Sequence, residues 1–128
     1  MPIPKYQEIL HPFLQFLSDE KNHTISEITE YLSKKFQLTD REKNQLKPSG
    51  GQELFKNRVG WARFYLKKSG LIEKLPNNNI RITKNGLIFF QSHASSFDNK
   101  VLMNIPQFSE FMKKLPRKET IKKFPEFD

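Results

Sequence analysis

The sequence predicts a mainly α-helical protein with a small β-hairpin wing, that is, a winged helix-turn-helix followed by a C-terminal helical or linker tail. Three observations lead to this fold class. Apolar residues recur at helical spacing in several segments, two short strand-like runs flank an asparagine-rich turn, and capping residues stand where the helices should begin. The chain has 128 residues, enough for one modest core.

The elements follow one another in a clear order. Residues 5–19 and the segment after His23 carry apolar side chains at helical spacing, with Thr24 or Ser26 as the cap of the second helix. Thr39 and Glu42 form a capping-box pattern for a short third helix over residues 40–46. Ser49 and Gln52 form a second such pattern, which predicts a long helix over residues 52–68 with Gly70 after its end.

A hairpin and a fourth amphipathic segment complete the predicted domain. The runs 71–75 and 80–83 are strand-like and enclose Pro76-Asn77-Asn78-Asn79, in which asparagine tolerates the positive φ of a tight turn. Thr83 can then cap a helix over residues 84–93. We therefore expect a winged helix-turn-helix domain over residues 1–93 and a tail over 94–128. The tail contains a short amphipathic helix near Pro106–Leu115, which either packs back on the domain or meets a partner.

Composition narrows the classes of protein. The chain contains no cysteine, so disulfides and thiolate metal sites are excluded, and its N-terminus is too polar for a signal peptide. No apolar run approaches the ~20 residues that span a bilayer. We expect a cytoplasmic protein. The three histidines show no metal-ligand spacing, and no phosphate-binding loop or nucleophile motif is present, so we expect no metal, no cofactor and no catalytic residues.

Positive charge is concentrated in one segment. Residues 43–70 carry seven basic residues and one acidic residue, which is six of the net charge of +8. Such a cluster on one element is typical of proteins that bind a polyanion, whereas a lysine-rich solvated surface is the plain alternative. At about 100° per residue, Phe55, Val59, Ala62 and Leu66 share one face of the long helix. Gln52, Lys56, Arg63 and Lys67 share the opposite face.

In a winged helix this second face lies in the major groove of double-stranded DNA. The predicted DNA-binding residues are Lys47, Ser49, Gly50, Gln52, Lys56, Asn57, Gly60, Arg63, Phe64, Lys67, Asn78 and Arg81. Within this set, Lys47, Lys56 and Lys67 are assigned to phosphates, and Gln52, Asn57 and Arg63 to base edges. Ser49 and Gly50 precede the helix N-terminus, where a phosphate can bind. Asn78 and Arg81 lie on the wing.

Four residues of the long helix, two of them in this set, need separate treatment. Phe64 falls near the polar side, so we expect it to be exposed and available to a base methyl group or a partner surface. Gly60 permits close approach either of DNA or of another helix. Arg58 projects into the apolar sector, and we expect it to pair with Glu27 or Glu30 of the second helix. Trp61 belongs to the core.

The stretch QELFKNRVGWARFYLKKSGLIEKLPNNNIRITKNGLIFF resembles the N-terminal domain of the Mrr restriction endonucleases. The resemblance is carried by Lys56-Asn57-Arg58, Gly60-Trp61-Ala62, Gly70-Leu71 and Thr83 to Gly86, with Pro4-Lys5-Tyr6 near the start, and covers residues 3–93. It implies a winged-helix DNA-recognition module attached to a nuclease that restricts modified, typically methylated, DNA. Nuclease domains of that family carry an Asp and an (Asp/Glu/Gln)-x-Lys motif on a sheet. Two fragments here imitate it, Asp19-Glu20-Lys21 and Asp40 with Gln45-Leu46-Lys47, and we interpret both as accidental.

The sequence thus favours a DNA-binding module of a type IV, Mrr-like restriction system without its own nuclease site. Its expected partners are duplex DNA, with or without a modified base, and either a nuclease domain in the full-length protein or a second copy of the chain. Two alternatives remain open. One is a stand-alone winged-helix transcriptional regulator, and the other is a winged-helix protein-interaction module.

Overall fold

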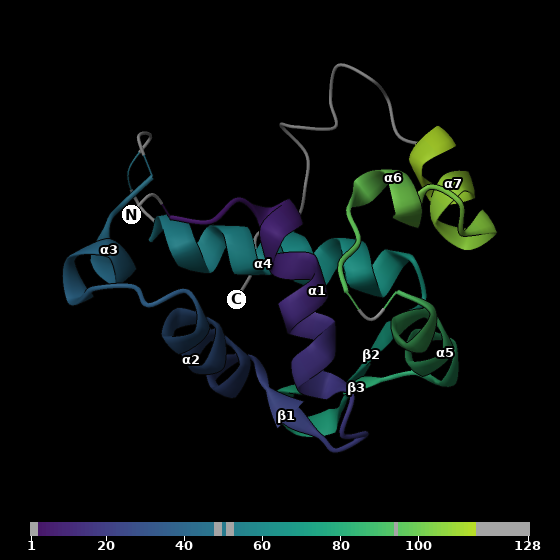
Figure 1. The fold of residues 1–128 in the computed structure, drawn as a ribbon, viewed down its shortest axis with the longest axis horizontal. Coiled ribbons are helices and arrows are strands. Elements are labelled where there is room, and N and C mark those ends of the chain that lie inside the picture. Colours follow the sequence, from purple (N-terminus) through teal and green to yellow (C-terminus); the bar gives the residue numbers. More distant parts are fainter. Residues whose placement is uncertain (1–2, 48–49, 51–52, 94, 115–128) are drawn as a thin grey trace.

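The computed structural model describes residues 3–47, 50, 53–93 and 95–114 (Figure 1). Its elements are α1 (Tyr6–Leu17), β1 (His23–Thr24), α2 (Ile25–Lys35), α3 (Asp40–Asn44), α4 (Leu54–Lys68), β2 (Ile72–Leu75), the 3-10 turn η1 (Pro76–Asn78), β3 (Asn79–Ile82), α5 (Lys84–Ser92), α6 (Asn99–Leu102) and α7 (Pro106–Lys113). The strands form an antiparallel sheet in the order β1-β3-β2. This is the mainly α, winged-helix-like fold that the sequence predicts, with the β2–β3 hairpin as its wing.

Side-chain caps fix the starts of α2 and α3. The Thr24 hydroxyl accepts a hydrogen bond from the Glu27 amide at 3.2 Å, and the Glu27 carboxylate accepts one from the Thr24 amide at 2.9 Å. Thr39 and Glu42 repeat this arrangement at the start of α3. Each reciprocal pair provides acceptors for two backbone amides that would otherwise have none at the helix N-terminus. The capping residue of α2 is therefore Thr24 and not Ser26.

Glycine ends α4 as predicted. Gly70 has a φ of +80°, the left-handed conformation that a side chain disfavours. Its amide donates to the Lys67 carbonyl at 3.0 Å, and the Leu71 amide donates to the Leu66 carbonyl at 3.0 Å. These two bonds form a Schellman motif, which turns the chain out of the helix directly into β2.

The same turn is tied to the start of α5 through Thr83. The Thr83 hydroxyl donates to the Gly70 carbonyl at 2.6 Å and accepts from the Gly86 amide at 2.9 Å. The Thr83 amide donates to the Leu71 carbonyl at 2.9 Å. One threonine thus caps α5 and closes the base of the wing, which fixes the hairpin relative to the end of α4.

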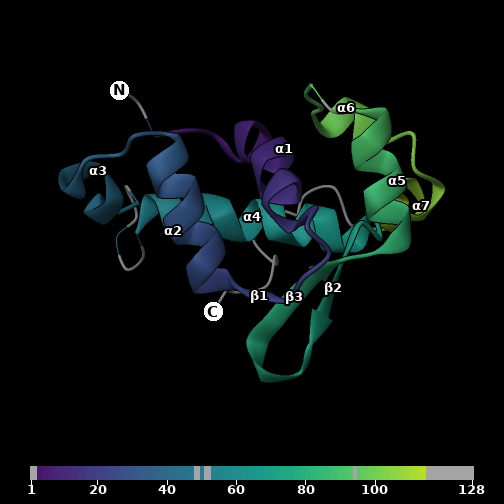
Figure 2. The same ribbon diagram turned by 60° about the horizontal axis from the view of Figure 1, so that its bottom comes forward.

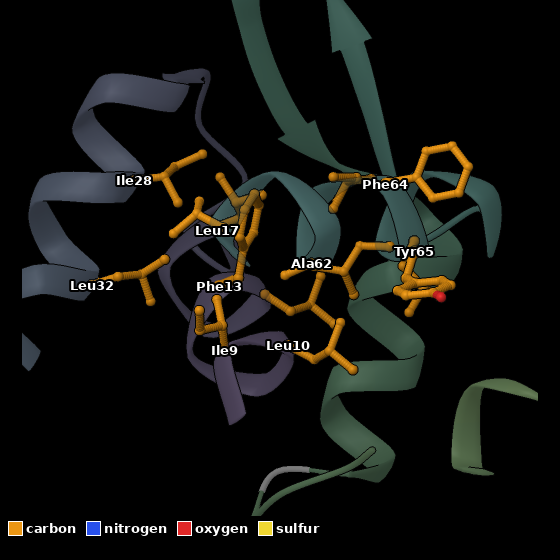
Figure 3. Close-up of a cluster of buried hydrophobic side chains, with 14 of the residues drawn as sticks. Ile9, Leu10, Phe13, Leu17, Ile28, Leu32, Ala62, Phe64 and Tyr65 are labelled. Carbon is orange, nitrogen blue, oxygen red and sulfur yellow. The ribbon is translucent and has the colours of Figure 1, made fainter. Parts of the chain in front are cut away.

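The hydrophobic core lies where α1, α2 and α4 meet. Figure 3 shows Ile9, Phe13 and Leu17 of α1 between Ile28 and Leu32 of α2 on one side and Ala62 of α4 on the other. All six side chains are fully buried. The predicted core face of α4 is confirmed, because Phe55, Val59, Ala62 and Leu66 are each at most 1% exposed. Figure 2 shows α4 running across the molecule beneath α1, with the hairpin projecting beyond both.

The tip of the wing has the backbone that its asparagines favour. Asn77 and Asn78 have φ values of 63° and 60°. β2 pairs with β3 from Ile72↔Ile82 to Leu75↔Asn79, and β1 adds His23↔Ile80 at the other edge of β3. Ile72, Ile80 and Ile82 are buried, so the hairpin is anchored to the core at its base.

The tail packs back on the domain, one of the two outcomes that the sequence left open. The predicted helix near residue 106 is α7, whereas α6 was not predicted. Phe97, Leu102 and Phe108 are buried in the same core cluster as α1 and α4. The ring of Phe108 lies 5.5 Å from that of Tyr65 in α4. Residues 115–128 lie outside the described part of the chain.

We predict that Gly86→Ala destabilises the fold strongly. A Cβ at this position would overlap the Leu71 carbonyl and stand 2.8 Å from Ile82 Cγ1, and a backbone carbonyl in a turn cannot move aside cheaply. We expect a loss of about 1–3 kcal/mol in the free energy of unfolding, measured by urea denaturation. The neighbouring Asn85 is exposed, and Asn85→Ala should change stability by about 0.5 kcal/mol or less. Equal stability of the two variants would contradict the close packing at Gly86.

Candidate nucleic-acid interface

The outward side of α4 presents cations at both ends of the helix. Lys56 and Lys67 are exposed, whereas Gly60 and Phe64 between them are buried. The two lysines are eleven residues apart, about 16 Å along the axis at ~1.5 Å per residue. The basic face predicted from the helical projection is therefore present as two basic ends and not as a continuous column.

The end nearer the wing carries the denser group of cations. Partial burial, followed by the positive charges of Lys68, Arg63 and Lys74, lowers the pKa of Lys67. Lys74 comes from β2 and is exposed. Within the described ranges, neither Lys67 nor Lys74 forms an ion pair with a carboxylate. We call Arg63, Lys67, Lys68 and Lys74 the basic cluster.

Sequence reasoning missed Lys74 and Lys68 as members of this cluster. Lys74 is not part of α4, so a helical projection of α4 does not contain it. It comes near Lys67 because the turn at Gly70 folds β2 back beside the end of the helix. No local pattern indicates this approach, because Ile72 and Lys74 lie on the same face of β2 by position and yet Ile72 is buried and Lys74 is exposed. Lys68 lies over the rings of Phe64 and Phe111, with its Nζ 5.7 Å and 5.0 Å from their centroids.

Phe64 is not exposed, and the expectation that it is available to a base methyl group is wrong. Its side chain is only 8% exposed and packs edge-on against Phe111 of α7, with ring centroids 5.6 Å apart. In Figure 3, Phe64 and Tyr65 lie at the opposite end of the cluster from Ile28 and Leu32. The tail, whose position the helical projection cannot show, covers this part of α4. Gly60 is buried too, which favours close approach of another protein segment over approach of DNA.

The other end of α4 differs from the sequence prediction in its cap. The helix begins at Leu54 with Glu53 as N-cap and without a side-chain cap bond, so the predicted Ser49–Gln52 capping box does not start it. Ser49 and Gln52 themselves lie outside the described residues. Lys56 pairs with Glu53 at 3.1 Å, which partly offsets the charge of this phosphate candidate.

The loop before α4 is closed by backbone hydrogen bonds. Leu46 and Glu53 form an antiparallel bridge, and the Leu54 amide donates to the Gln45 carbonyl at 2.7 Å. The Lys47 carbonyl accepts from the Gly50 amide at 2.8 Å, and Gly50 has a φ of +78° with no atom near a would-be Cβ. Lys47 is therefore held near the start of α4, but the Gly50 amide is already used within the turn.

The wing residues differ from one another in their surroundings. Asn78 is exposed at the tip. Arg81 pairs across the hairpin with Glu73 at 3.3 Å, so its charge is partly offset. Lys74 thus presents a more open charge than Arg81, the wing residue that the sequence favoured. Asn57, a base-edge candidate on α4 and not on the wing, is partly buried.

The predicted ion pair of Arg58 is wrong. The Arg58 guanidinium donates through Nη1 to the carbonyls of Ile3 at 2.7 Å and Pro4 at 3.2 Å. These bonds secure the segment that leads into α1, and they satisfy a half-buried charge with backbone dipoles in place of a carboxylate. The sequence could not show this because the partners are backbone atoms more than fifty residues away.

Two further findings concern the described residues only. They contain no group of three or more His, Asp or Glu side chains that could hold a metal ion. None of the helices described is both long and apolar enough to cross a membrane.

Comparison with known proteins settles the family. The model of the Mrr N-terminal domain matches residues 6–92, well over half of the chain. This chain belongs to the Mrr N-terminal domain family. It is 29% identical over 94 residues to the type IV methyl-directed restriction enzyme EcoKMrr of Escherichia coli strain K12, a match that covers 73% of this chain and 31% of that enzyme. The chain thus spans about a third of the relative's length. No solved structure matches it significantly.

Four of the residues that carried the resemblance to the Mrr N-terminal domain have clear structural roles. Arg58 holds the N-terminal segment, Gly70 ends α4, and Thr83 with Gly86 closes the base of the wing. They identify the fold, whereas the basic cluster is the candidate interface.

We predict that Arg58→Ala destabilises the protein by about 1.5–3 kcal/mol, because two buried carbonyls lose a charged donor. Chemical denaturation measures the loss. Lys56→Ala serves as the control, since Lys56 is 65% exposed and should change stability by about 0.5 kcal/mol or less. If Arg58→Ala leaves stability unchanged but weakens binding to nucleic acid, the structural role of Arg58 is refuted.

Proposed function

We propose that this chain is the DNA-recognition module of a type IV, Mrr-like restriction system, and that it reads a modified base in duplex DNA. The observation that carries the proposal is the basic cluster. Three cations surround Lys67, and no described carboxylate pairs with Lys67 or Lys74. Positive charges gathered at the junction of a helix and a wing attract a polyanion such as the phosphate backbone of DNA.

The spacing of the cations suits a duplex. The basic ends of α4 are about 16 Å apart by helix rise, compared with a major groove about 12 Å wide, so Lys56 and Lys67 can reach phosphates on its two sides. The two ends of α4 would then meet the groove, and Arg63, beside Lys67, is the candidate for a base edge. The wing would place Lys74 and Asn78 along the adjacent backbone.

The proposal that this chain reads a modified base rests on its similarity to a methyl-directed relative and not on the charge pattern. The relative is named as methyl-directed, and it is a restriction enzyme three times as long as the matched region. We propose that this chain supplies recognition and that the nuclease activity resides in another domain. Under this proposal the module itself is not an enzyme and needs no cofactor, and its second partner is a nuclease domain or a second copy of the chain.

One observation favours the protein-interaction alternative. Ile88 of α5 is 54% exposed and Met103, just after α6, is 42% exposed. Both belong to the region of α5 to α7, which Figure 2 shows at the end of the molecule away from α2 and α3. A protein partner on that side is compatible with DNA on the wing side, so the two functions do not exclude each other.

We predict that Lys67→Ala and Lys74→Ala each weaken binding to all duplexes alike and reduce the slope of log K against log salt by about 1. Each removes a phosphate contact, which is independent of sequence. Fluorescence anisotropy at several salt concentrations measures both effects. Lys100→Ala in α6 is the control, because Lys100 is exposed on an element away from the wing. Equal effects of all three substitutions would reduce the basic cluster to general surface charge.

A further inference from the structure

Lys67 is the central residue of the basic cluster. Partial burial, and then the positive charges of Lys68, Arg63 and Lys74, lower the pKa of its ammonium group. A neutral amine carries a lone pair and an ammonium group does not, so a lysine in such surroundings is a better nucleophile than an ordinary surface lysine. Lys67 remains exposed, so a small molecule in solution can reach its amine.

Carboxylates, which would hold the ammonium group in its charged form, are scarce around the cluster. The segment 54–97 contains one acidic residue, Glu73. Glu73 pairs with Arg81 across the hairpin at 3.3 Å, and by position it lies on the face of β2 opposite to that of Lys74. Within the described residues Lys67 thus lacks a carboxylate partner. Several lysines elsewhere pair with an acid three or four residues away, namely Lys34, Lys43, Lys56 and Lys113.

The other members of the cluster are less suited to react as free amines. The Nζ of Lys68 lies over the rings of Phe64 and Phe111, so its ammonium group is already engaged with two aromatic faces. Lys74 is exposed on the wing, where water stabilises an ammonium group. The guanidinium of Arg63 stays charged and offers no amine. We therefore expect Lys67 to be the first of the four to react.

The cations around Lys67 also select the reagent. Positive charges gathered on one surface raise the local concentration of small anions. An anion that carries an activated carbonyl group would be brought close to the Lys67 amine in this way. Acyl phosphates combine the two features, because the phosphate supplies the negative charge and also serves as the leaving group. A neutral acyl donor would gain nothing from the cluster.

We propose that Lys67 is an acylation site, at which an acyl phosphate transfers its acyl group to Nζ and thereby removes a DNA contact. The neutral Nζ attacks the carbonyl carbon, the bond from that carbon to the bridging phosphate oxygen breaks, and inorganic phosphate leaves with the electron pair. The nitrogen loses a proton to water. The product is an uncharged amide, and nothing is oxidised or reduced. The transfer itself does not depend on DNA, whereas its consequence rests on the proposed DNA-binding function.

The first experiment measures the rate of acylation at each lysine. The full chain is incubated with acetyl phosphate, the remaining amines are capped with deuterated acetic anhydride, and chymotryptic peptides are compared by mass spectrometry. We expect Lys67 to react at least about threefold faster than Lys100, an exposed lysine of α6, because a lysine reacts only as the neutral amine. Equal rates at these two lysines would overturn the proposal.

Lys74→Met should slow the acetylation of Lys67 by about twofold or more, because it removes one of the charges that attract the reagent and lower the pKa of the amine. Lys35→Met is the matched control. It removes the same charge from the last turn of α2, where Lys35 is exposed, and should leave the rate at Lys67 unchanged. An equal fall in both variants would reduce the effect to net charge and overturn the role of the cluster.

Binding to a duplex tests the consequence. After limited acetylation, the affinity of the chain at low salt should fall by about threefold or more, and the slope of log K against log salt should fall by about 1. Lys67→Arg keeps a positive charge and has no amine to acylate, so acetyl phosphate should not weaken its binding. An equal loss of affinity in Lys67→Arg and in the unsubstituted chain would place the effect at other lysines and overturn the proposal.

The failures of the two proposals are distinguishable. Unselective acetylation in a chain that binds duplex DNA overturns the acylation site and leaves the DNA-binding function in place. Selective acetylation of Lys67 in a chain that binds no duplex overturns the DNA-binding function and supports the reactive lysine alone. Protection of Lys67, but not of Lys100, by added duplex supports both.

Discussion

Packing of α4 against α1 determines which side chains of α4 can act on a partner. Val59, Ala62 and Leu66 are buried on the α1 side, and the tail adds Phe108 and Phe111 near the C-terminal half of the helix. What remains outside is a basic position near the first turn and a group of cations near the last. The burial that stabilises the fold thus selects the two places where α4 meets solvent with positive charge.

The wing is the second constraint, because it brings a cation from another element to the helix end. Gly70 turns the chain through a Schellman motif, and Thr83 bonds back to that turn from the start of α5. Lys74 consequently stands close enough to Lys67 to affect its pKa. Like charges held together in this way cost stability, and an anionic partner would relieve the cost. The structural residues of the Mrr N-terminal domain and its candidate binding residues are therefore coupled through one turn.

Local chemistry was enough to predict most of the fold. The caps at Thr24, Thr39 and Thr83, the glycine at 70 and the asparagine turn each depend on residues within a few positions, which is why the sequence shows them. The site was less predictable. Phe64 is covered by α7, Arg58 binds distant carbonyls, and Lys74 approaches Lys67 across a turn, so each depends on tertiary contacts that a helical projection cannot contain. The assignment of individual DNA contacts stays a prediction.

The central claim is that the end of α4 and the base of the wing form one DNA-binding surface. An ¹H–¹⁵N correlation spectrum of the labelled chain, titrated with a duplex at low salt, tests it most directly. We expect the largest shift changes in residues 63–68 and 72–81, with a smaller group near Lys56 and little change in α5 and α6. Changes confined to α5, α6 and α7, or none at all, would contradict it.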